Sequence, residues 1–179
     1  MEKKNKVFIA TSLDGYIADK NGGIDWLDSI PNPGNNDMGY GEFNSRIDAL
    51  IMGRTTFETV LGFDIDWPYQ KPVFVLSNTL TEIPGKYKGK AYLVKGPIKE
   101  ILDNIHKKGF YRLYIDGGKV IQSFLKEDLI DEMVITIIPT LLGTGIPLFS
   151  NLPSKLDFEC VNSRIYLHKI VQNHFKRLK

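Results

Sequence analysis

The chain has 179 residues, a length that suits one α/β domain with its own hydrophobic core, so residues 1–179 are expected to form a single domain. A net charge of +2 with scattered lysines argues against a nucleic-acid-binding surface, and neither a signal peptide nor a membrane span is expected. The single cysteine excludes a disulfide framework and a cysteine metal cluster, and the protein is expected in the cytoplasm.

The first strand is predicted over 7–11 and is followed by a brief extended segment, 16–18. The next segment, 19–40, is rich in Gly, Asn and Pro and is predicted to be a long loop, with a short helix near its end. Long loops in compact domains are usually functional. This loop carries Trp26, so it is either a lid that closes over a ligand or a plug that seals the core, and both interpretations stay open.

The segment 48–58, DALIMGRTTFE, predicts a junction of strand, glycine turn and helix. Residues 49–52 are a short apolar run typical of a buried strand, Gly53 breaks it, and helical spacing follows. Such a junction aims the first backbone N–H groups of the helix at whatever lies above the strand, and Arg54 adds a positive charge. The junction is either a phosphate site or an ordinary helix start with a solvent-facing arginine.

Two further strands are predicted over 72–76 and 91–94. A helix then begins at Pro97, carries apolar residues at i, i+3, i+4 and i+7, and ends at Gly109.

A second junction follows, with a strand over 113–115, the pair Gly117 and Gly118, and an amphipathic helix. Two such junctions in one α/β chain predict two loops at the carboxyl edge of one parallel sheet, where ligands bind. Paired glycines let the backbone approach a diphosphate closely, so replacing either is expected to abolish binding without unfolding the protein. The pattern indicates a nucleotide-sized anion and leaves its identity open.

The last part of the chain departs from the alternation of strands and helices. A strand over 133–138 leads into a Gly/Pro-rich loop, 140–153, and the chain closes with an antiparallel hairpin of strands 158–162 and 165–175.

Candidate catalytic groups are few. His106 lies off the apolar stripe of its helix and is expected in solvent, and His168 and His174, on one face of a predicted strand, are not expected to bind a metal. The carboxylates near the predicted site are Asp14, Asp37 and Glu42. This inventory suits chemistry performed by a bound cofactor, with the protein supplying position and one proton.

Five motifs in order resemble the dihydrofolate reductase superfamily: SLDGYIA, LIMGRTTFE, FVLS, YIDGGKVIQSF and IPTLLGTGIPLF. The first and last are most similar to the reductase domain of the riboflavin-biosynthesis deaminase-reductase and its stand-alone relatives. The resemblance implies an α/β fold, a three-layer α/β/α arrangement with a mostly parallel central sheet and an antiparallel C-terminal hairpin. It also implies NADPH as cofactor, a small-molecule substrate and a homodimer.

The resemblance also implies roles for individual residues. Asp37 lies where the proton-relay carboxylate of dihydrofolate reductase falls, and Trp26 and Asp14 are expected at the substrate. The cofactor would contact residues of five segments: Ala10, Ile17, Gly53, Arg54, Thr55, Ser77, Asn78, Gly117, Gly118, Lys119 and Val120.

The chain departs from both branches of the superfamily. No Pro-Trp-x-Leu-Pro segment precedes Asp37, no deaminase signature is present, and Tyr16 stands where the riboflavin reductases often carry a lysine. We therefore expect an NADPH-dependent reductase of a small heterocyclic substrate, similar to dihydrofolate reductase or 5-amino-6-(5-phosphoribosylamino)uracil reductase. The alternative is an NADP(H)-binding protein without turnover.

Overall fold

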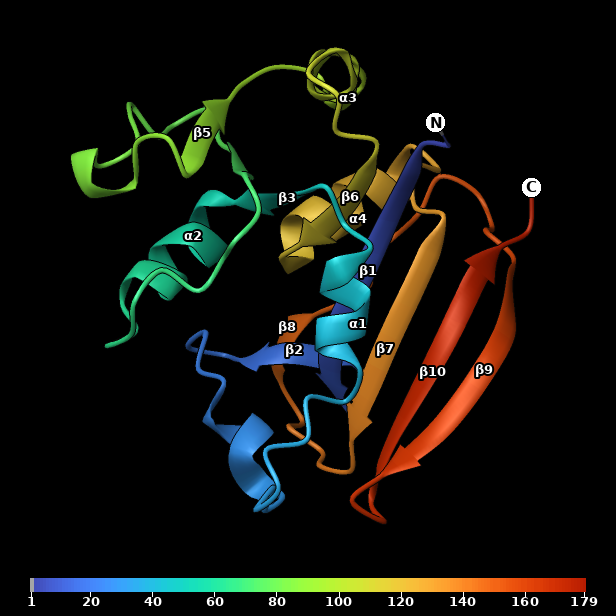
Figure 1. Cartoon of the computed structure of the whole chain (residues 1–179). Coiled ribbons are helices and arrows are strands. Elements are labelled where there is room, and N and C mark those ends of the chain that lie inside the picture. The colour runs from blue at the N-terminus through green and yellow to red at the C-terminus, as the bar shows by residue number, and fades with distance from the viewer. Residues whose placement is uncertain (1) are drawn as a thin grey trace.

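The computed structural model describes residues 2–179, and its central feature is an eight-stranded sheet of order β5-β4-β3-β6-β1-β7-β10-β9 (Figure 1). Strands β2 and β8 form a separate two-stranded ribbon. The strands are β1 Lys4–Ser12, β2 Tyr16–Asp19, β3 Ala49–Gly53, β4 Val73–Leu76, β5 Ala91–Val94, β6 Arg112–Asp116, β7 Glu132–Ile138, β8 Gly145–Pro147, β9 Phe158–Tyr166 and β10 Ile170–Arg177.

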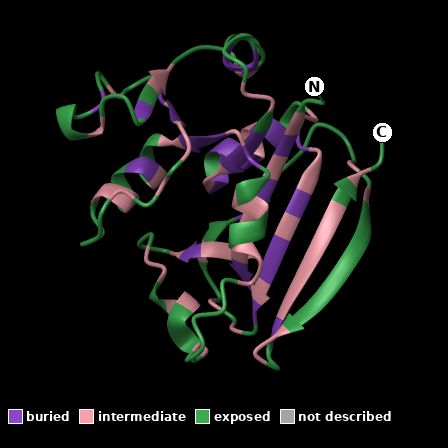
Figure 2. Ribbon diagram, in the orientation of Figure 1, coloured by how far each residue is buried: buried purple, intermediate pink, exposed green. Residues whose placement is uncertain are grey.

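Strands β1 and β3 to β7 pair in parallel, β10 runs antiparallel to β7, and β9 closes the sheet antiparallel to β10. Strands β3, β4 and β6 are short apolar runs that are buried along most of their length (Figure 2). Such runs are typical of parallel strands that helices cover on both faces. The predicted mostly parallel sheet with an antiparallel C-terminal hairpin is confirmed.

Helices cover both faces of the sheet, which makes three layers. Residues Phe43 of α1 and Phe57 of α2 pack on one face, and Ile105 of α3 and Phe124 of α4 pack on the other. The helices are α1 Tyr40–Ser45, α2 Arg54–Leu61, α3 Ile98–Lys107 and α4 Gly118–Lys126, with two 3-10 turns, η1 Asp25–Ser29 and η2 Gly85–Tyr87. Among residues 2–179, no helix has the length and apolar character that a membrane span needs.

Two features of the C-terminal half differ from the sequence prediction. The hairpin turns at 167–169, because Leu167 and His168 adopt the left-handed conformation without a glycine to signal it. His168 therefore lies in the turn and does not share a strand face with His174. The loop 140–153 contains strand β8, which pairs with β2.

The prediction for His106 was wrong. Its side chain is buried, and its ring stacks on Tyr111 with the ring centres 6.0 Å apart. The last turn of α3 is covered by the segment that leads into β6, a contact that the helical periodicity does not reveal.

Candidate active site

The central sheet splits between β1 and β6 at its carboxyl edge. The two strands are paired over three residues, ending at Lys6 and Tyr114, although both continue beyond that point. Strand β1 stays with β7 as far as Ser12, while β6 stays with β3 as far as Asp116. The connection after β3 leads outward to β4, and the one after β6 leads across β1 to β7. The split is therefore a topological switch point, where open α/β sheets bind ligands.

The two predicted glycine junctions meet beside this split. A Cβ on Gly53 would lie 3.2 Å from Cγ2 of Val120, so the start of α2 contacts α4. A Cβ on Gly117 would collide with the hydroxyl of Thr56 on α2. Within residues 2–179, no side chain caps the N-terminus of either helix. The N–H groups of both first turns are thus donors available to an anion.

The backbone conformation and surroundings of Gly117 favour a structural role and argue against the expectation that its substitution would leave the fold intact. Its φ is +86°, and the collision with Thr56 adds to the strain. We expect Gly117→Ala to lower the free energy of unfolding by about 2 kcal/mol or more in urea titrations. The matched control is Gly85→Ala, since no atom lies within 4 Å of a Cβ there, and it should change stability by less than about 0.5 kcal/mol. Equal stabilities of the two variants would contradict this role.

Arg54 is held at the turn after β4. Its Nε donates to Oε1 of Glu58 at 2.7 Å, and its Nη1 donates to Oγ1 of Thr79 at 3.2 Å. The hydroxyl of Ser77 accepts the backbone N–H groups of Thr79 and Leu80 at 3.2 and 3.0 Å, which fixes this turn. The guanidinium is half exposed, so a ligand phosphate can reach it.

The other predicted cofactor residues divide into exposed and packed ones. Thr55, Asn78 and Lys119 are exposed at the carboxyl edge. Val120 is buried against Gly53, and Ile17 of β2 packs at the second junction, 2.6 Å from where a Cβ on Gly118 would lie. Ala10 of β1 pairs with Thr136 of β7. All predicted cofactor segments therefore come together along one edge of the sheet.

Asp116 stands at the split itself, and the sequence patterns did not single it out. It ends β6 opposite Met52, and its Oδ1 accepts the N–H of Gly117 at 2.8 Å. Burial raises the pKa of the Asp116 carboxyl to about 6. The residue nevertheless keeps partial solvent exposure at the end of β6, beside the sheet split. A carboxyl group that is partly protonated near neutral pH can act as a general acid.

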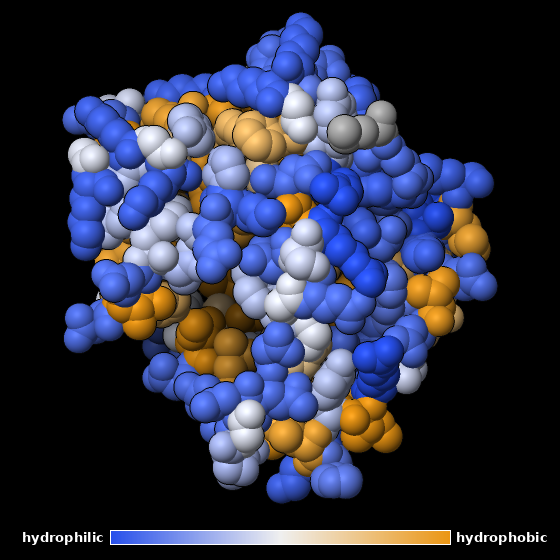
Figure 3. Space-filling view, in the orientation of Figure 1, coloured by the Kyte–Doolittle hydropathy of each residue, from blue (hydrophilic) through white to orange (hydrophobic). Residues whose placement is uncertain are grey.

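Three tyrosine hydroxyls lie within electrostatic reach of Asp116. Their own burial and its charge raise the pKa values of the Tyr40, Tyr69 and Tyr114 hydroxyls, so all three stay protonated. Tyr114 donates to the carbonyl oxygen of Phe8 at 2.8 Å. Figure 3 shows a hollow with apolar walls between α2 and the ribbon of β2 and β8. A cleft of this kind accepts a flat ring.

Asp37 is an exposed residue that caps α1. Its Oδ1 accepts the N–H of Gly39 at 2.9 Å, and its Oδ2 accepts the N–H of Gly41 at 2.8 Å. These backbone hydrogen bonds hold the pKa of the Asp37 carboxyl below its usual value. An ionised capping carboxylate is a poor proton donor, so this geometry does not support the proton-relay role expected for Asp37.

The two residues expected at the substrate have other surroundings. The carboxylate of Asp14 accepts the hydroxyl of Ser12 at 2.6 Å and the N–H groups of Leu142 and Gly143 at 3.1 and 2.7 Å, which lower its pKa. The Asp14 carboxylate thereby fixes the loop that follows β7. Trp26 lies in η1, and its buried indole N–H has no hydrogen-bond partner within the described part of the chain. A ligand or a closing movement of this loop would have to supply one.

The split sheet with its two glycine junctions defines an open α/β domain with a topological switch point at its carboxyl edge. The family model "RibD C-terminal domain" matches residues 6–171, and the chain belongs to this family. It is 34% identical to the Bacillus subtilis (strain 168) protein YwjB over 180 residues, which is 99% of each chain.

Solved structures agree with this assignment. A putative riboflavin biosynthesis protein from Shewanella sp. PV-4 is 57% identical, with a TM-score of 0.96 over 98% of this chain and 99% of that one. Dihydrofolate reductase from Enterococcus faecalis, solved with NADP(H), has a TM-score of 0.67 at 16% identity, over 98% of this chain and 97% of that one. The dihydrofolate reductase-like fold expected from the sequence motifs is confirmed.

Proposed function

We propose that this protein is an NADPH-dependent reductase of a small heterocyclic substrate, pterin-like or ribosylaminopyrimidine-like. The observation that carries the proposal is the position of Asp116. A carboxyl group of raised pKa lies at the sheet split, beside two uncapped helix N-termini and within electrostatic reach of three tyrosine hydroxyls. Membership in the RibD C-terminal domain family supports a reductase, and the likeness to an NADP(H)-bound dihydrofolate reductase supports the cofactor.

The residues at this edge fit NADPH. The N–H groups of the first turns of α2 and α4 would hold its diphosphate, and Arg54 beside Thr79 would hold its 2′-phosphate. Ala10 and Ile17 would flank the nicotinamide. Bound there, NADPH supplies a hydride to the substrate.

The chain itself supplies orientation and a proton. Tyr40 and Tyr69, whose hydroxyls lie within electrostatic reach of Asp116, would pack against a flat heterocycle. The protonated carboxyl of Asp116 then donates its proton to the nitrogen or oxygen atom that gains electrons when the adjacent carbon is reduced. The cleft is open to solvent, so water restores the proton afterwards.

The test is NADPH oxidation against a panel of pterins and ribosylaminopyrimidines, followed by the loss of nicotinamide absorbance. The proposal expects substrate-dependent oxidation by at least one compound class. Tight NADPH binding without oxidation across the panel would instead favour an NADP(H)-binding protein without turnover.

We also propose a homodimer that uses the edge strand β9. This strand is exposed along almost its whole length (Figure 2), and Ile165 on it is 71% exposed. Exposed edge strands with apolar side chains invite pairing with another chain. We expect wild-type protein to sediment as a dimer and Ile165→Lys to sediment as a monomer. The control Ile65→Lys, at a residue that is 61% exposed in the loop before β4, should leave the dimer intact. A monomeric wild type would contradict the proposal.

A further inference from the structure

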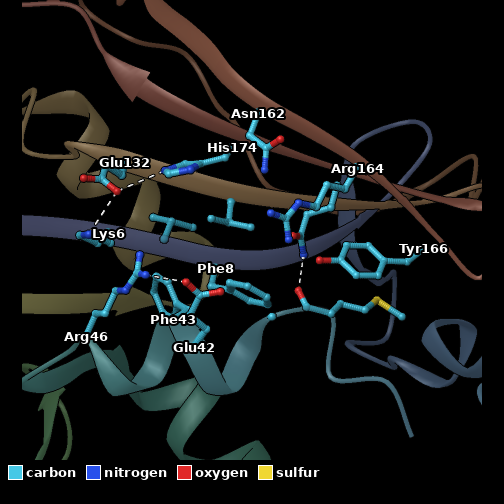
Figure 4. A pocket seen from close by; sticks show the side chains of 15 residues that line it. Lys6, Phe8, Glu42, Phe43, Arg46, Glu132, Asn162, Arg164, Tyr166 and His174 are labelled. Carbon is cyan, nitrogen blue, oxygen red and sulfur yellow. Dashed lines mark hydrogen bonds and ion pairs between the residues drawn. The ribbon is translucent and has the colours of Figure 1, made fainter. Parts of the chain in front are cut away.

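A cavity, the α1–β10 pocket, lies between α1 and the strands β1, β7, β9 and β10 (Figure 4). It has a volume of about 240 Å³. The proposed reductase function uses none of its polar side chains. This volume is below the roughly 300–1,000 Å³ of pockets for drug-sized ligands, so it suits a molecule with a single ring.

One part of the pocket lining is an ionic group centred on Glu132. Glu132 Oε2 lies 3.1 Å from Lys6 Nζ and 3.2 Å from His174 Nε2, and all three side chains are largely buried. The hydrogen bond to His174 and the interactions with Lys6 lower the pKa of Glu132 to about 2. The carboxylate is therefore charged at all physiological pH values, and its Oε2 is occupied by these two partners.

The side wall of the pocket carries two arginines, Arg46 and Arg164, which differ in their pairing. Arg46 is paired with Glu42 on α1, whereas Arg164 makes no ion pair or side-chain hydrogen bond with the residues that the structure describes. Figure 4 shows its side chain directed from β9 into the pocket. With His174 left aside, three cations and two carboxylates line the pocket, which leaves a net charge of +1.

The other lining residues indicate the shape and polarity of a ligand that would fit the pocket. Phe8, Phe43 and Val134 supply an apolar side, and Asn162 and Tyr166 flank Arg164 with polar groups. A flat apolar ring can pack against the first group while a planar anion meets the guanidinium fork. A monoanion neutralises the lining, whereas a dianion would also be repelled by Glu42 and Glu132.

We propose that the α1–β10 pocket binds a small aromatic monocarboxylate through Arg164, at a site separate from the reductase cleft. Benzoate is the probe for this class, benzamide is its uncharged counterpart of the same shape, and inorganic phosphate is the dianionic comparison.

Isothermal titration calorimetry of the full-length protein provides the test. Benzoate should bind, benzamide and phosphate should bind more weakly, and Arg164→Gln should weaken benzoate binding at least tenfold because a charge-assisted hydrogen bond is lost. The control Lys155→Gln removes an exposed positive charge elsewhere and should leave binding unchanged. Melting temperatures of both variants should match wild type, since neither side chain is buried.

Saturating NADPH should leave the affinity for benzoate unchanged. Displacement of benzoate by NADPH would place the ligand in the reductase cleft and overturn the proposal. So would absent benzoate binding, equal affinity of the Arg164→Gln variant, or tighter binding of phosphate. None of these results depends on whether the protein turns over NADPH.

Discussion

Replacing Asp116 by asparagine is expected to lower kcat by about 10²–10⁴-fold, the range by which a positioned general acid accelerates a reaction. Asparagine has nearly the same shape, and its side-chain oxygen can still accept the N–H of Gly117, which Asp116 Oδ1 accepts at 2.8 Å. NADPH affinity should therefore change by less than about twofold. Steady-state kinetics and cofactor fluorescence titrations measure the two quantities separately.

The pH dependence gives a second readout of the same group. Since burial raises the pKa of Asp116 to about 6, its protonated fraction falls as the pH rises through that value. Wild-type kcat should decline above about pH 6, and the residual rate of Asp116→Asn should lack this decline. The control Asp37→Asn alters an exposed capping carboxylate and should keep the wild-type pH profile. A flat profile for wild type, or near-normal kcat for Asp116→Asn, would remove Asp116 from the mechanism.

The same substitution should increase stability at neutral pH. The folded-state pKa of Asp116 lies above the ordinary aspartate value of 3.8 that applies to the unfolded chain. Between about pH 4 and 6 the folded state therefore binds more protons, and the free energy of unfolding falls as the pH rises across that window. An asparagine side chain is neutral and would remove this penalty, so a variant that is both slower and more stable separates catalytic loss from unfolding.

Arg54→Ala is expected to weaken NADPH binding by about 10–150-fold and to leave NADH binding nearly unchanged. The guanidinium would make a charge-assisted contact to the 2′-phosphate that is worth about 1.5–3 kcal/mol, and NADH lacks this phosphate. Cofactor fluorescence titrations with both nucleotides measure the difference.

Two variants help to interpret this result. Glu58→Gln keeps the shape of the side chain that holds Arg54 Nε at 2.7 Å but removes its competing charge, so NADPH affinity should rise or stay equal. The control is Arg46→Ala at the end of α1, since Arg46 also pairs with a glutamate four residues away, Glu42. This variant should not change the affinity for NADPH or NADH. Equal losses for NADPH and NADH in Arg54→Ala would show that Arg54 serves only the shared diphosphate.

The parts of the site that depend on local chain chemistry could be predicted from the sequence. A short apolar run, a glycine and a helical pattern are adjacent at Gly53 and again at Gly117, and backbone preferences alone turn each of them into a strand–turn–helix junction. The helix predicted from Pro97 to Gly109 is present as α3, Ile98–Lys107, for the same reason. Parallel pairing then brings both junctions to one edge.

Periodicity and spacing do not report the contacts on which some residues' roles depend. The proton-relay role of Asp37 stays a prediction, and the hydrogen bonds that its carboxylate accepts from Gly39 and Gly41 do not favour it. His106 lies off the apolar stripe of α3 and is still buried, because Tyr111 folds back over it. The spacing of apolar residues predicts which helix face packs on the sheet, and it does not predict burial of another face by a neighbouring loop.

Asp116 shows most clearly what only the tertiary structure decided. In the sequence it is one aspartate between a strand and a glycine pair, and in a short peptide it would have an ordinary pKa. Its raised pKa comes from burial in the folded chain, and its charge in turn raises the pKa values of Tyr40, Tyr69 and Tyr114, which three different segments contribute. Desolvation and charge act through space, so the pKa of Asp116 depends on the folded chain. The split between β1 and β6 beside this carboxyl forms only when β1 pairs with β7 and β6 pairs with β3.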